Sequence, residues 1–367
     1  MKRLSFAVLM IFLLVFATAG CGSKVDQNEH PAAKSTVVTT KADQAAAKNP
    51  AASGQEKGNK PDLSSAGKPS SVQMPLPNKG TAGTVTLMIT RDFGKQVLVK
   101  KEAVLDKNST VLDVLKANSN VSTKYDGSYV SSMQGLQSNT GGISGDNSDW
   151  FYYINGICSD AGAGDYNLKA GEHIWWDYHP WKSAGFVNSA VIGCFPEPFI
   201  HGYRGKINGA VVMASPENTA LAAELEQTLK NRGAANVNRV ELSNGLLEKR
   251  ARPTIVIGTW PELKQLEWLH QFNNAWKKTG TGSHFTDNSL ELLDYGGNAA
   301  RTISGSAGII AAAGAGLGDA NPIWIIAGTD QKGLQEAVEV LTKSPAKISG
   351  MYSAAVTSGE IIRLPLQ

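Results

Sequence analysis

A dense group of aromatic side chains with one histidine stands in the middle of this 367-residue chain. Four of the eight tryptophans lie between residues 150 and 181, in the runs Trp150-Phe151-Tyr152-Tyr153-Ile154 and Ile174-Trp175-Trp176-Asp177-Tyr178-His179-Pro180-Trp181. Neighbouring residues of a strand point to opposite faces, so these rings cannot all enter one small core. Exposed aromatic sets of this size are commonly binding surfaces. The alternative is that they cover the sheet against a neighbouring part of the chain. The candidate ligand-binding residues are Trp150, Tyr152, Tyr153, Trp175, Trp176, Tyr178, His179 and Trp181.

Local signatures of catalysis are absent from the sequence. It contains no Gly-x-Ser-x-Gly, no His-Glu-x-x-His and no Cys-x-x-Cys pair, and no cluster with metal-ligand spacing. The run Gly314-Ala315-Gly316-Leu317-Gly318 lacks the Lys-Ser/Thr of a phosphate loop and precedes a strand, which favours a glycine turn. We therefore expect a binding protein rather than an enzyme, without a catalytic residue, a metal site or a resident cofactor.

The first twenty residues have the pattern of an export signal. Lys2 and Arg3 precede the apolar run from Phe6 to Phe16, which is too short to span a bilayer. Thr18-Ala19-Gly20 then stands directly before Cys21, and this resembles the lipobox of bacterial lipoproteins. The resemblance implies removal of 1–20, lipidation of Cys21 by diacylglycerol and palmitate, and anchoring at the extracytoplasmic face of the cell membrane. An ordinary secretory signal or an uncleaved anchor is the alternative.

A polar segment follows and separates the anchor from the folded part. Residues 22–83 contain no Phe, Tyr or Trp and cannot bury enough apolar surface to fold. We expect 21–83 to be a disordered stalk with a reach of roughly 40–45 Å. The positive charge lies in the signal, at +2, and in the stalk, at +3, because residues 84–367 hold 25 Lys or Arg against 27 Asp or Glu. This balance excludes a nucleic-acid partner.

Residues 84–190 have the pattern of a β-rich domain with one helix. Val85, Leu87 and Ile89 alternate with polar residues, as expected of a half-buried strand. Thr110 with Asp113 predicts a capped helix start, and Asn155-Gly156 predicts a hairpin turn. Cys158, near this turn, and Cys194, in a linker over 191–204, form a candidate disulfide; two unpaired thiols are the alternative.

Part of this domain resembles a known family. Trp150–Gly156, Gly162-Ala163-Gly164-Asp165-Tyr166, Leu168-Lys169, Gly171-Glu172 and Ile174-Trp175-Trp176 are similar to the transcobalamin C-terminal-like domain. That domain occurs in lipoproteins and surface proteins of Gram-positive bacteria and in the animal cobalamin carriers transcobalamin and intrinsic factor. The resemblance implies a β-grasp-like α+β fold and a corrinoid such as cobalamin as ligand. His179 is then a candidate axial ligand to the cobalt, since neutral imidazole is a common metal ligand.

Residues 205–367 alternate apolar strands with amphipathic helices. Strands are predicted at 210–213, 254–257, 309–310 and 323–326, with helices beginning near Ser215 and Pro261 and a last helix capped by Thr329 or Asp330. This order predicts a three-layer α/β domain with a mainly parallel sheet. Ligands of such sheets bind at the carboxyl ends of the strands, near Gly258-Thr259, Gly314–Gly318 and Gly328-Thr329-Asp330.

These observations predict a lipid-anchored surface protein that captures a ligand, best a corrinoid, for uptake. The α/β domain then supplies the opposing surface or docks a transporter. The alternative is a structural protein that interacts with the cell wall or a surface layer and has no small-molecule ligand.

Overall fold

The computed structural model describes residues 81–127, 129–139, 147–181, 188–207 and 209–367, all of which belong to one compact unit. The predicted signal peptide, Cys21 and nearly all of the predicted stalk lie outside the described residues. Among the helices that are described, none is long and apolar enough to cross a membrane.

The aromatic runs belong to a five-stranded sheet. Its order is β2-β1-β8-β6-β7, built from β1 (Thr81–Arg91), β2 (Gln96–Asp106), β6 (Asn147–Ile154), β7 (Ile157–Cys158) and β8 (His173–Trp181). The central pair β1 and β8 is parallel, and the other pairs are antiparallel. The predicted Asn155-Gly156 turn joins β6 to β7 with positive φ at both residues, as a tight hairpin requires.

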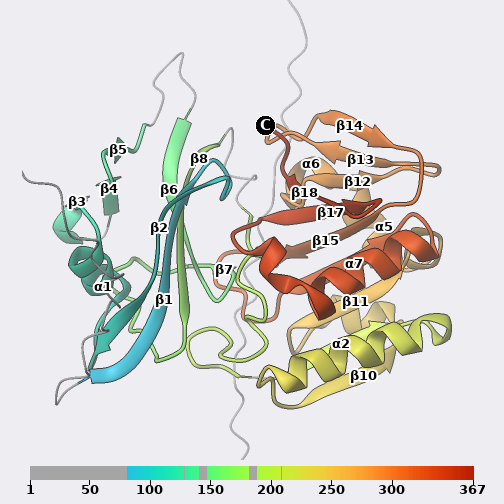
Figure 1. Ribbon diagram of the computed structural model, residues 1–367, viewed down its shortest axis with the longest axis horizontal. Coiled ribbons are helices and arrows are strands. Elements are labelled where there is room, and N and C mark those ends of the chain that lie inside the picture. The colour runs from blue at the N-terminus through green and yellow to red at the C-terminus, as the bar shows by residue number, and fades with distance from the viewer. Residues whose placement is uncertain (1–80, 128, 140–146, 182–187, 208) are drawn as a thin grey trace, which may run out of the picture. The chain divides into compact units, whose positions relative to one another are not determined.

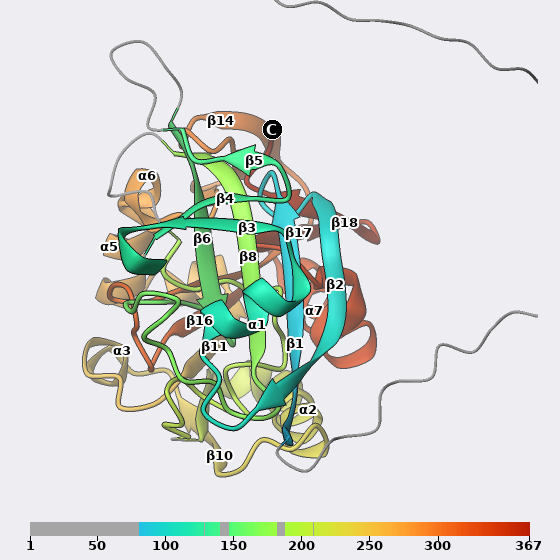
Figure 2. The same cartoon turned by 90° about the vertical axis from the view of Figure 1, so that its left-hand side faces the viewer.

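One face of this sheet is covered by α1 (Val111–Asn118) and by a small sheet of β3 (Val121–Lys124), β4 (Tyr129–Met133) and β5 (Leu136–Gln137). A 3₁₀ turn, η1 (Tyr125–Gly127), joins β3 to β4. Figure 2 shows α1 and these short strands crossing in front of the long strands. The predicted capping box is confirmed, because the Thr110 side chain accepts from the Asp113 N–H and the Asp113 carboxylate accepts from the Thr110 N–H.

A seven-stranded sheet forms the second half, in the order β10-β9-β11-β16-β15-β17-β18 (Figure 1). Its strands are β9 (Ala210–Ala214), β10 (Val237–Glu241), β11 (Thr254–Thr259), β15 (Gly308–Ala313), β16 (Ile323–Gly328), β17 (Ser353–Thr357) and β18 (Glu360–Leu364).

Both faces of the seven-stranded sheet are covered, so the region has three layers. The core on one face includes residues of α2 (Thr219–Asn231) and α7 (Gln331–Lys343), and 3₁₀ turns η3 (Pro216–Asn218) and η4 (Pro345–Ile348) flank these helices. The core on the other face takes residues from short helices and from a three-stranded sheet. These elements are α3 (Asn244–Glu248), α4 (Trp260–Leu263), α5 (Glu267–Asn274), β12 (Ser283–Phe285), β13 (Leu290–Leu293) and β14 (Ala299–Ile303). The short α6 (Trp276–Thr279) lies between α5 and β12 and has no buried residue.

Two expectations for this half were wrong. The sheet is mixed, because β15, β17 and β18 pair antiparallel with their neighbours. The connection over 314–322 between β15 and β16 is too short for the helical crossover that parallel pairing needs. The helix predicted from Pro261 through Phe272 is interrupted between α4 and α5, where the Asn244 side chain accepts a 2.8 Å hydrogen bond from the Trp268 N–H. Both differences depend on tertiary contacts.

Candidate functional site

The aromatic set lies on both faces of the five-stranded sheet, and both faces are covered. Trp150 and Trp176 belong to the hydrophobic cluster that contains α1, with Tyr152 and Tyr178 packed against it. Tyr153 and Trp175 belong to a second cluster on the opposite face. Trp150, Tyr153, Trp175, Trp176 and His179 are buried, whereas Tyr152, Tyr178 and Trp181 are partly exposed.

On the first face, the rings are fixed by hydrogen bonds to β5. Trp150 Nε1 donates to the Leu136 carbonyl at 3.2 Å, and the Tyr178 hydroxyl donates to the Gln137 carbonyl at 2.7 Å. The rings of Trp150 and Tyr178 lie 5.1 Å apart. These two residues therefore hold the small sheet in place.

On the opposite face, His179 is held inside an aromatic cage. Its ring stacks between Phe93, at 4.4 Å, and Phe151, at 4.3 Å, and Tyr352 meets its edge. Nδ1 lies 2.9 Å from Oδ2 of Asp177, and the side chain of His179 is 3% exposed. In this structure the ring of His179 is buried among its aromatic neighbours.

Asp177 is the polar centre of this buried cluster. Its carboxylate accepts hydrogen bonds from the Thr90 hydroxyl, from the Gly94 N–H at 2.9 Å and from the Tyr352 hydroxyl at 3.3 Å. Trp175 Nε1 donates to the Thr90 hydroxyl at 2.7 Å. A buried carboxylate needs such partners, and Tyr352, the residue directly before β17, supplies one of them.

Direct contact between a ligand and the eight predicted residues remains a prediction. The structure brings them together around one sheet, but it does not gather them on an open surface. Their burial agrees with the alternative that the rings cover the sheet against neighbouring parts of the chain.

Cys158 and Cys194 are free, buried thiols in the same cluster, so the candidate disulfide is not formed in this structure. Burial raises the pKa of Cys158 to about 12 and raises the pKa of Cys194 further still. Both thiols are therefore neutral and unreactive in the folded protein. The predicted linker over 191–204 also supplies the buried side chains of Val191, Ile192 and Phe199.

An open groove of about 470 Å³ lies beside the small sheet. It is lined by side chains of β3, η1, β4, β5 and the start of β6, namely Lys124, Tyr125, Tyr129, Ser131, Gln137, Ser138 and Asp149. This volume falls within the usual range of small-molecule sites. Tyr125 is 78% exposed, and its ring centroid lies 6.4 Å from that of Tyr129.

Asp149 is the fixed acceptor of this groove. Its carboxylate accepts from Ser138 Oγ at 2.6 Å, from Tyr129 OH at 3.2 Å and from the Trp150 N–H at 2.7 Å. Burial raises the pKa of Tyr129, so its hydroxyl stays protonated and donates to the carboxylate. The groove thus combines aromatic faces, an oriented carboxylate and the exposed amine of Lys124.

The sequence prediction missed Tyr125, Tyr129 and Asp149. They lie in or beside a stretch rich in Ser, Gly and Asn, residues that are typical of loops. The available signal was the pair of tyrosines in an otherwise polar stretch, because isolated aromatic residues in a polar loop often mark a binding surface.

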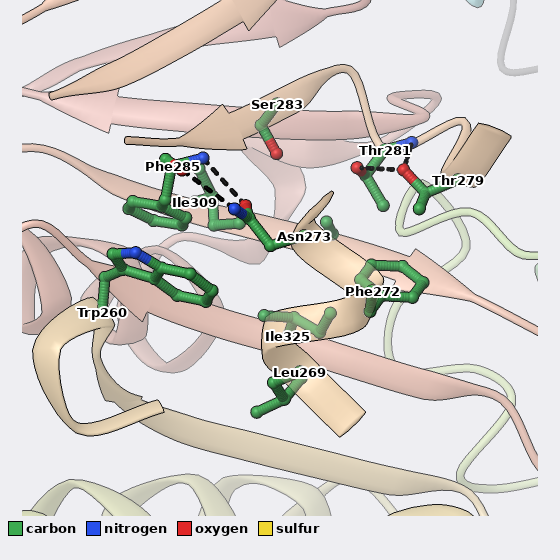
Figure 3. A pocket seen from close by; sticks show the side chains of 11 residues that line it. Trp260, Leu269, Phe272, Asn273, Thr279, Thr281, Ser283, Phe285, Ile309 and Ile325 are labelled. Atoms are coloured by element: carbon green, nitrogen blue, oxygen red, sulfur yellow. Dashed lines mark hydrogen bonds between the residues drawn. The ribbon is translucent and has the colours of Figure 1, made fainter. Parts of the chain in front are cut away.

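The seven-stranded region holds two hollows near the ends of β11 and β16. A narrow apolar pocket of about 20 Å³ is lined by Trp260, Leu269, Phe272, Asn273 and Phe285 among others. Figure 3 shows the rings of Trp260 and Phe285 together at one end of this pocket and Phe272 at the other. It has room for one water-sized molecule.

The second hollow is a polar cleft of about 210 Å³ that shares Trp260 and Phe285 with the first. Thr329 and Asp330, which follow β16 directly, line it. This agrees with the prediction that a site of this sheet lies near Gly328-Thr329-Asp330. Gly258-Thr259 and the Gly314–Gly318 turn do not line the cleft.

Glu262 occupies the crevice where the strand order changes between β9 and β11. Its carboxylate accepts from Ser215 Oγ at 2.7 Å, from Asn218 Nδ2 at 3.0 Å and from the Thr259 N–H at 2.7 Å. Although burial acts in the other direction, these hydrogen bonds keep the pKa of Glu262 below its usual value. The donors are satisfied internally, which leaves this crevice without a free anion site.

Two carboxylates in the half that contains the five-stranded sheet have raised pKa values. Burial raises the pKa of Glu172 and that of Glu197, despite hydrogen bonds from Tyr166 OH to Glu172 at 2.9 Å and a 2.5 Å contact between His201 and Glu197. Among the described residues, no group of His, Cys, Asp and Glu has an arrangement that could hold a metal ion.

Comparison with known proteins finds a family for part of the chain. The family model described as "Domain of unknown function (DUF4430)" matches residues 108–180, which include α1, the small sheet, the groove and nearly all of β8. No curated protein matches the chain.

Two solved structures show a limited likeness. Haptocorrin, crystallised in complex with Cbi, is 17% identical over 29% of this chain, with a TM-score of 0.24, and the match spans only 27% of haptocorrin's own chain. A suspected metal binding protein from Ruminococcus gnavus ATCC 29149 is 12% identical over 27% of this chain and 99% of its own, with a TM-score of 0.22. Likenesses at this level carry no weight for the ligand.

Proposed function

We propose that this chain is a non-enzymatic surface lipoprotein, anchored through Cys21 at the extracytoplasmic face of the membrane, that captures a corrinoid in the groove around Asp149. The export signal, Cys21 and the polar stalk support the anchor. The resemblance of residues 150–176 to the transcobalamin C-terminal-like domain supports the ligand class.

The observation that carries the proposal is the fixed carboxylate of Asp149 in a groove that is also lined by two tyrosine rings. A corrinoid has an apolar macrocycle whose rim carries carboxamide groups. The Tyr125 and Tyr129 rings offer faces against which the macrocycle edge packs. Asp149, which already takes three donors, has further lone pairs to accept an amide N–H.

The buried aromatic residues have a positioning role in this proposal. The Trp150 N–H donates to Asp149, while the indole of the same residue holds the Leu136 carbonyl of β5. Tyr178 holds the neighbouring Gln137 carbonyl. These contacts fix the wall of the groove before a ligand arrives, which reduces the entropy lost on binding.

The test is a titration of the full-length protein with cobinamide, followed by calorimetry and by the visible absorption bands of the corrinoid. Asp149→Asn removes the charge at nearly constant shape, and Tyr125→Ala removes an exposed ring. We expect each to weaken binding by about tenfold, or ~1.4 kcal/mol.

Leu317→Ala is the matched control, since Leu317 is exposed and does not line the groove. It should bind like the unmodified protein. Absence of heat and of a band shift at millimolar cobinamide, or equal affinity in all variants, would contradict the proposal.

A further inference from the structure

The polar cleft of the seven-stranded region is a second candidate site, separate from the groove. Trp260 begins α4 directly after β11, and Thr329 and Asp330 follow β16, so the cleft opens at the carboxyl ends of two neighbouring parallel strands. Figure 1 shows β11 beside α7, which begins after Asp330. Parallel strands of open α/β sheets present their ligand sites at this end.

A largely buried aromatic pair, Trp260 at 8% and Phe285 at 5% exposed, closes the inner end of the cleft. The rings of Trp260 and Phe285 are stacked, with centroids 5.0 Å apart and planes inclined by 10°. The backbone of Phe285 is fixed by Asn273, whose side chain both donates to the Phe285 carbonyl and accepts from its N–H at 2.9 Å (Figure 3). The position of this aromatic wall is therefore set before any ligand binds.

The outer rim carries hydroxyl groups from three separate loops. Thr286 and Ser289 share a 2.8 Å hydrogen bond in the turn after β12. Ser306, from the loop before β15, donates to Asp330 at 2.7 Å, and Thr329 donates to the Gly305 carbonyl at 3.0 Å. Each hydroxyl oxygen keeps lone pairs that can accept a hydrogen bond from a ligand.

The charges at the cleft exclude an anionic ligand. Its charged lining residues are Asp287 and Asp330, and no Lys or Arg lines it. Asp330 also caps α7, because its carboxylate accepts from the Gly333 N–H at 2.8 Å. The positive end of the helix dipole is thus already compensated by an internal carboxylate.

We propose that this cleft binds a neutral sugar unit of a surface polysaccharide. A pyranose ring has an apolar C–H face that packs against an aromatic wall and equatorial hydroxyls that pair with a polar rim. The combination of one aromatic pair, several hydroxyls and two carboxylates fits such a ring better than a phosphate, a carboxylate or an extended apolar chain. The volume of about 210 Å³ fits one sugar unit.

The test uses the full-length protein and two neutral probes, chitotriose and maltotriose, in calorimetric titrations. Gly305 lines the cleft, and a Cβ atom added there meets no other atom within 4 Å. Gly305→Tyr should therefore fold normally and fill the cleft. We expect millimolar binding of at least one probe and a loss of tenfold or more in Gly305→Tyr.

Gly316→Tyr is the matched control, because Gly316 also faces open space and lies outside the cleft. It should leave the affinity unchanged. Trigalacturonic acid, which is anionic, should bind more weakly than the neutral probes. No heat with either neutral probe at about 20 mM, equal loss in both tyrosine variants, or preference for the acid would overturn the assignment.

The inference is independent of corrinoid binding. Cobinamide titrations of Gly305→Tyr should match those of the unmodified protein, because the Asp149 groove shares no lining residue with the cleft. These titrations can therefore contradict one proposal without affecting the other.

Discussion

The two large sheets bury their faces with different kinds of side chain. The five-stranded sheet places aromatic rings on both faces. Trp175 and Tyr178 donate to fixed partners, Thr90 and the Gln137 carbonyl, whereas Tyr153 OH and Trp176 Nε1 are buried without a hydrogen-bond partner among the described residues. The seven-stranded sheet uses aliphatic and small residues, such as Ile309 to Ala313 in β15, between helices and a second small sheet. Buried Trp and Tyr side chains carry polar atoms that usually find hydrogen-bond partners, whereas aliphatic side chains carry none.

Gly333 shows how closely backbones approach each other in the seven-stranded half. A Cβ atom on this residue of α7 would lie 2.1 Å from the Ala307 carbonyl oxygen, which no real contact permits. The helix can therefore rest against the sheet only with glycine at this position. Beside the aromatic cluster around Tyr352 the backbones also approach closely, since a Cβ atom on Gly94 would collide with the Gly350 carbonyl oxygen. In the cluster itself, ring faces and edges meet at 5.2 to 5.6 Å.

Buried carboxylates with opposite pKa shifts occur in the two halves. In the aromatic half, burial dominates and raises the pKa of Glu172, whereas in the seven-stranded half hydrogen bonds lower the pKa of Glu262 and of Asp330. The contribution of Glu172 to stability should therefore fall as the pH rises, whereas the contributions of Glu262 and Asp330 should fall as the pH falls.

Among the variants that test this comparison, Tyr352→Ala should cause the largest loss of stability. The side chain is fully buried, contacts the rings of Phe93, Tyr153, Trp175 and His179, and donates to Asp177. We expect a loss of about 3–5 kcal/mol in the free energy of unfolding by urea. Tyr352→Phe, which removes only the hydroxyl, should cost about 1 kcal/mol.

Ile326→Val is the matched change in the aliphatic sheet. Ile326 is fully buried in β16, and the variant should cost about 1 kcal/mol. If Tyr352→Ala lowered the free energy of unfolding no more than Ile326→Val does, the ring cluster would not have the stabilising role described above.

An intermediate effect is expected for Glu262→Ala, which removes the acceptor for Ser215, Asn218 and Thr259. The loss should be about 1–2 kcal/mol at pH 7. Because the folded-state pKa of Glu262 is lowered, its contribution is present above the ordinary Glu pKa and disappears as the pH falls through the folded-state value. Urea unfolding at pH 7 and pH 3 measures this. A loss that grows on acidification would contradict the assignment.

The smallest effect should come from Glu172→Gln. With its folded-state pKa raised by burial, Glu172 favours folding when protonated, so its contribution falls as the pH rises from the ordinary Glu pKa through the folded-state value. The Gln variant should remove this dependence, a change on the order of 1 kcal/mol or less. Urea midpoints measured between pH 4 and pH 7 test this pH dependence. An unchanged pH profile would contradict a buried carboxylate whose pKa is raised in the folded state.

Local signals in the sequence predicted local structure well. The Thr110 capping box, the Asn155-Gly156 turn and the Asp330 cap depend on residues within three or four positions of one another, and all three are present. The strands of the aromatic runs and of the α/β half also lie where alternation and apolar runs predict them.

Features that depend on distant residues were not predictable in this way. The aromatic face around His179 is closed by Tyr352, which lies 173 positions further along the chain. The groove depends on Tyr129 and Ser138 meeting Asp149 across a small sheet that the sequence presents as a polar loop. Pairing of this kind is decided by tertiary packing, which single-sequence patterns do not encode.

The most direct test of the central claim is hydrogen–deuterium exchange of the full-length protein with and without cobinamide. The proposed site predicts slower exchange at 121–137 and 147–150, where the groove lies, and no change at 254–290 or 304–330 around the second cleft. Unchanged exchange at 121–137 and 147–150 in the presence of saturating cobinamide, or protection confined to the second cleft, would contradict the assignment of the groove as the corrinoid site.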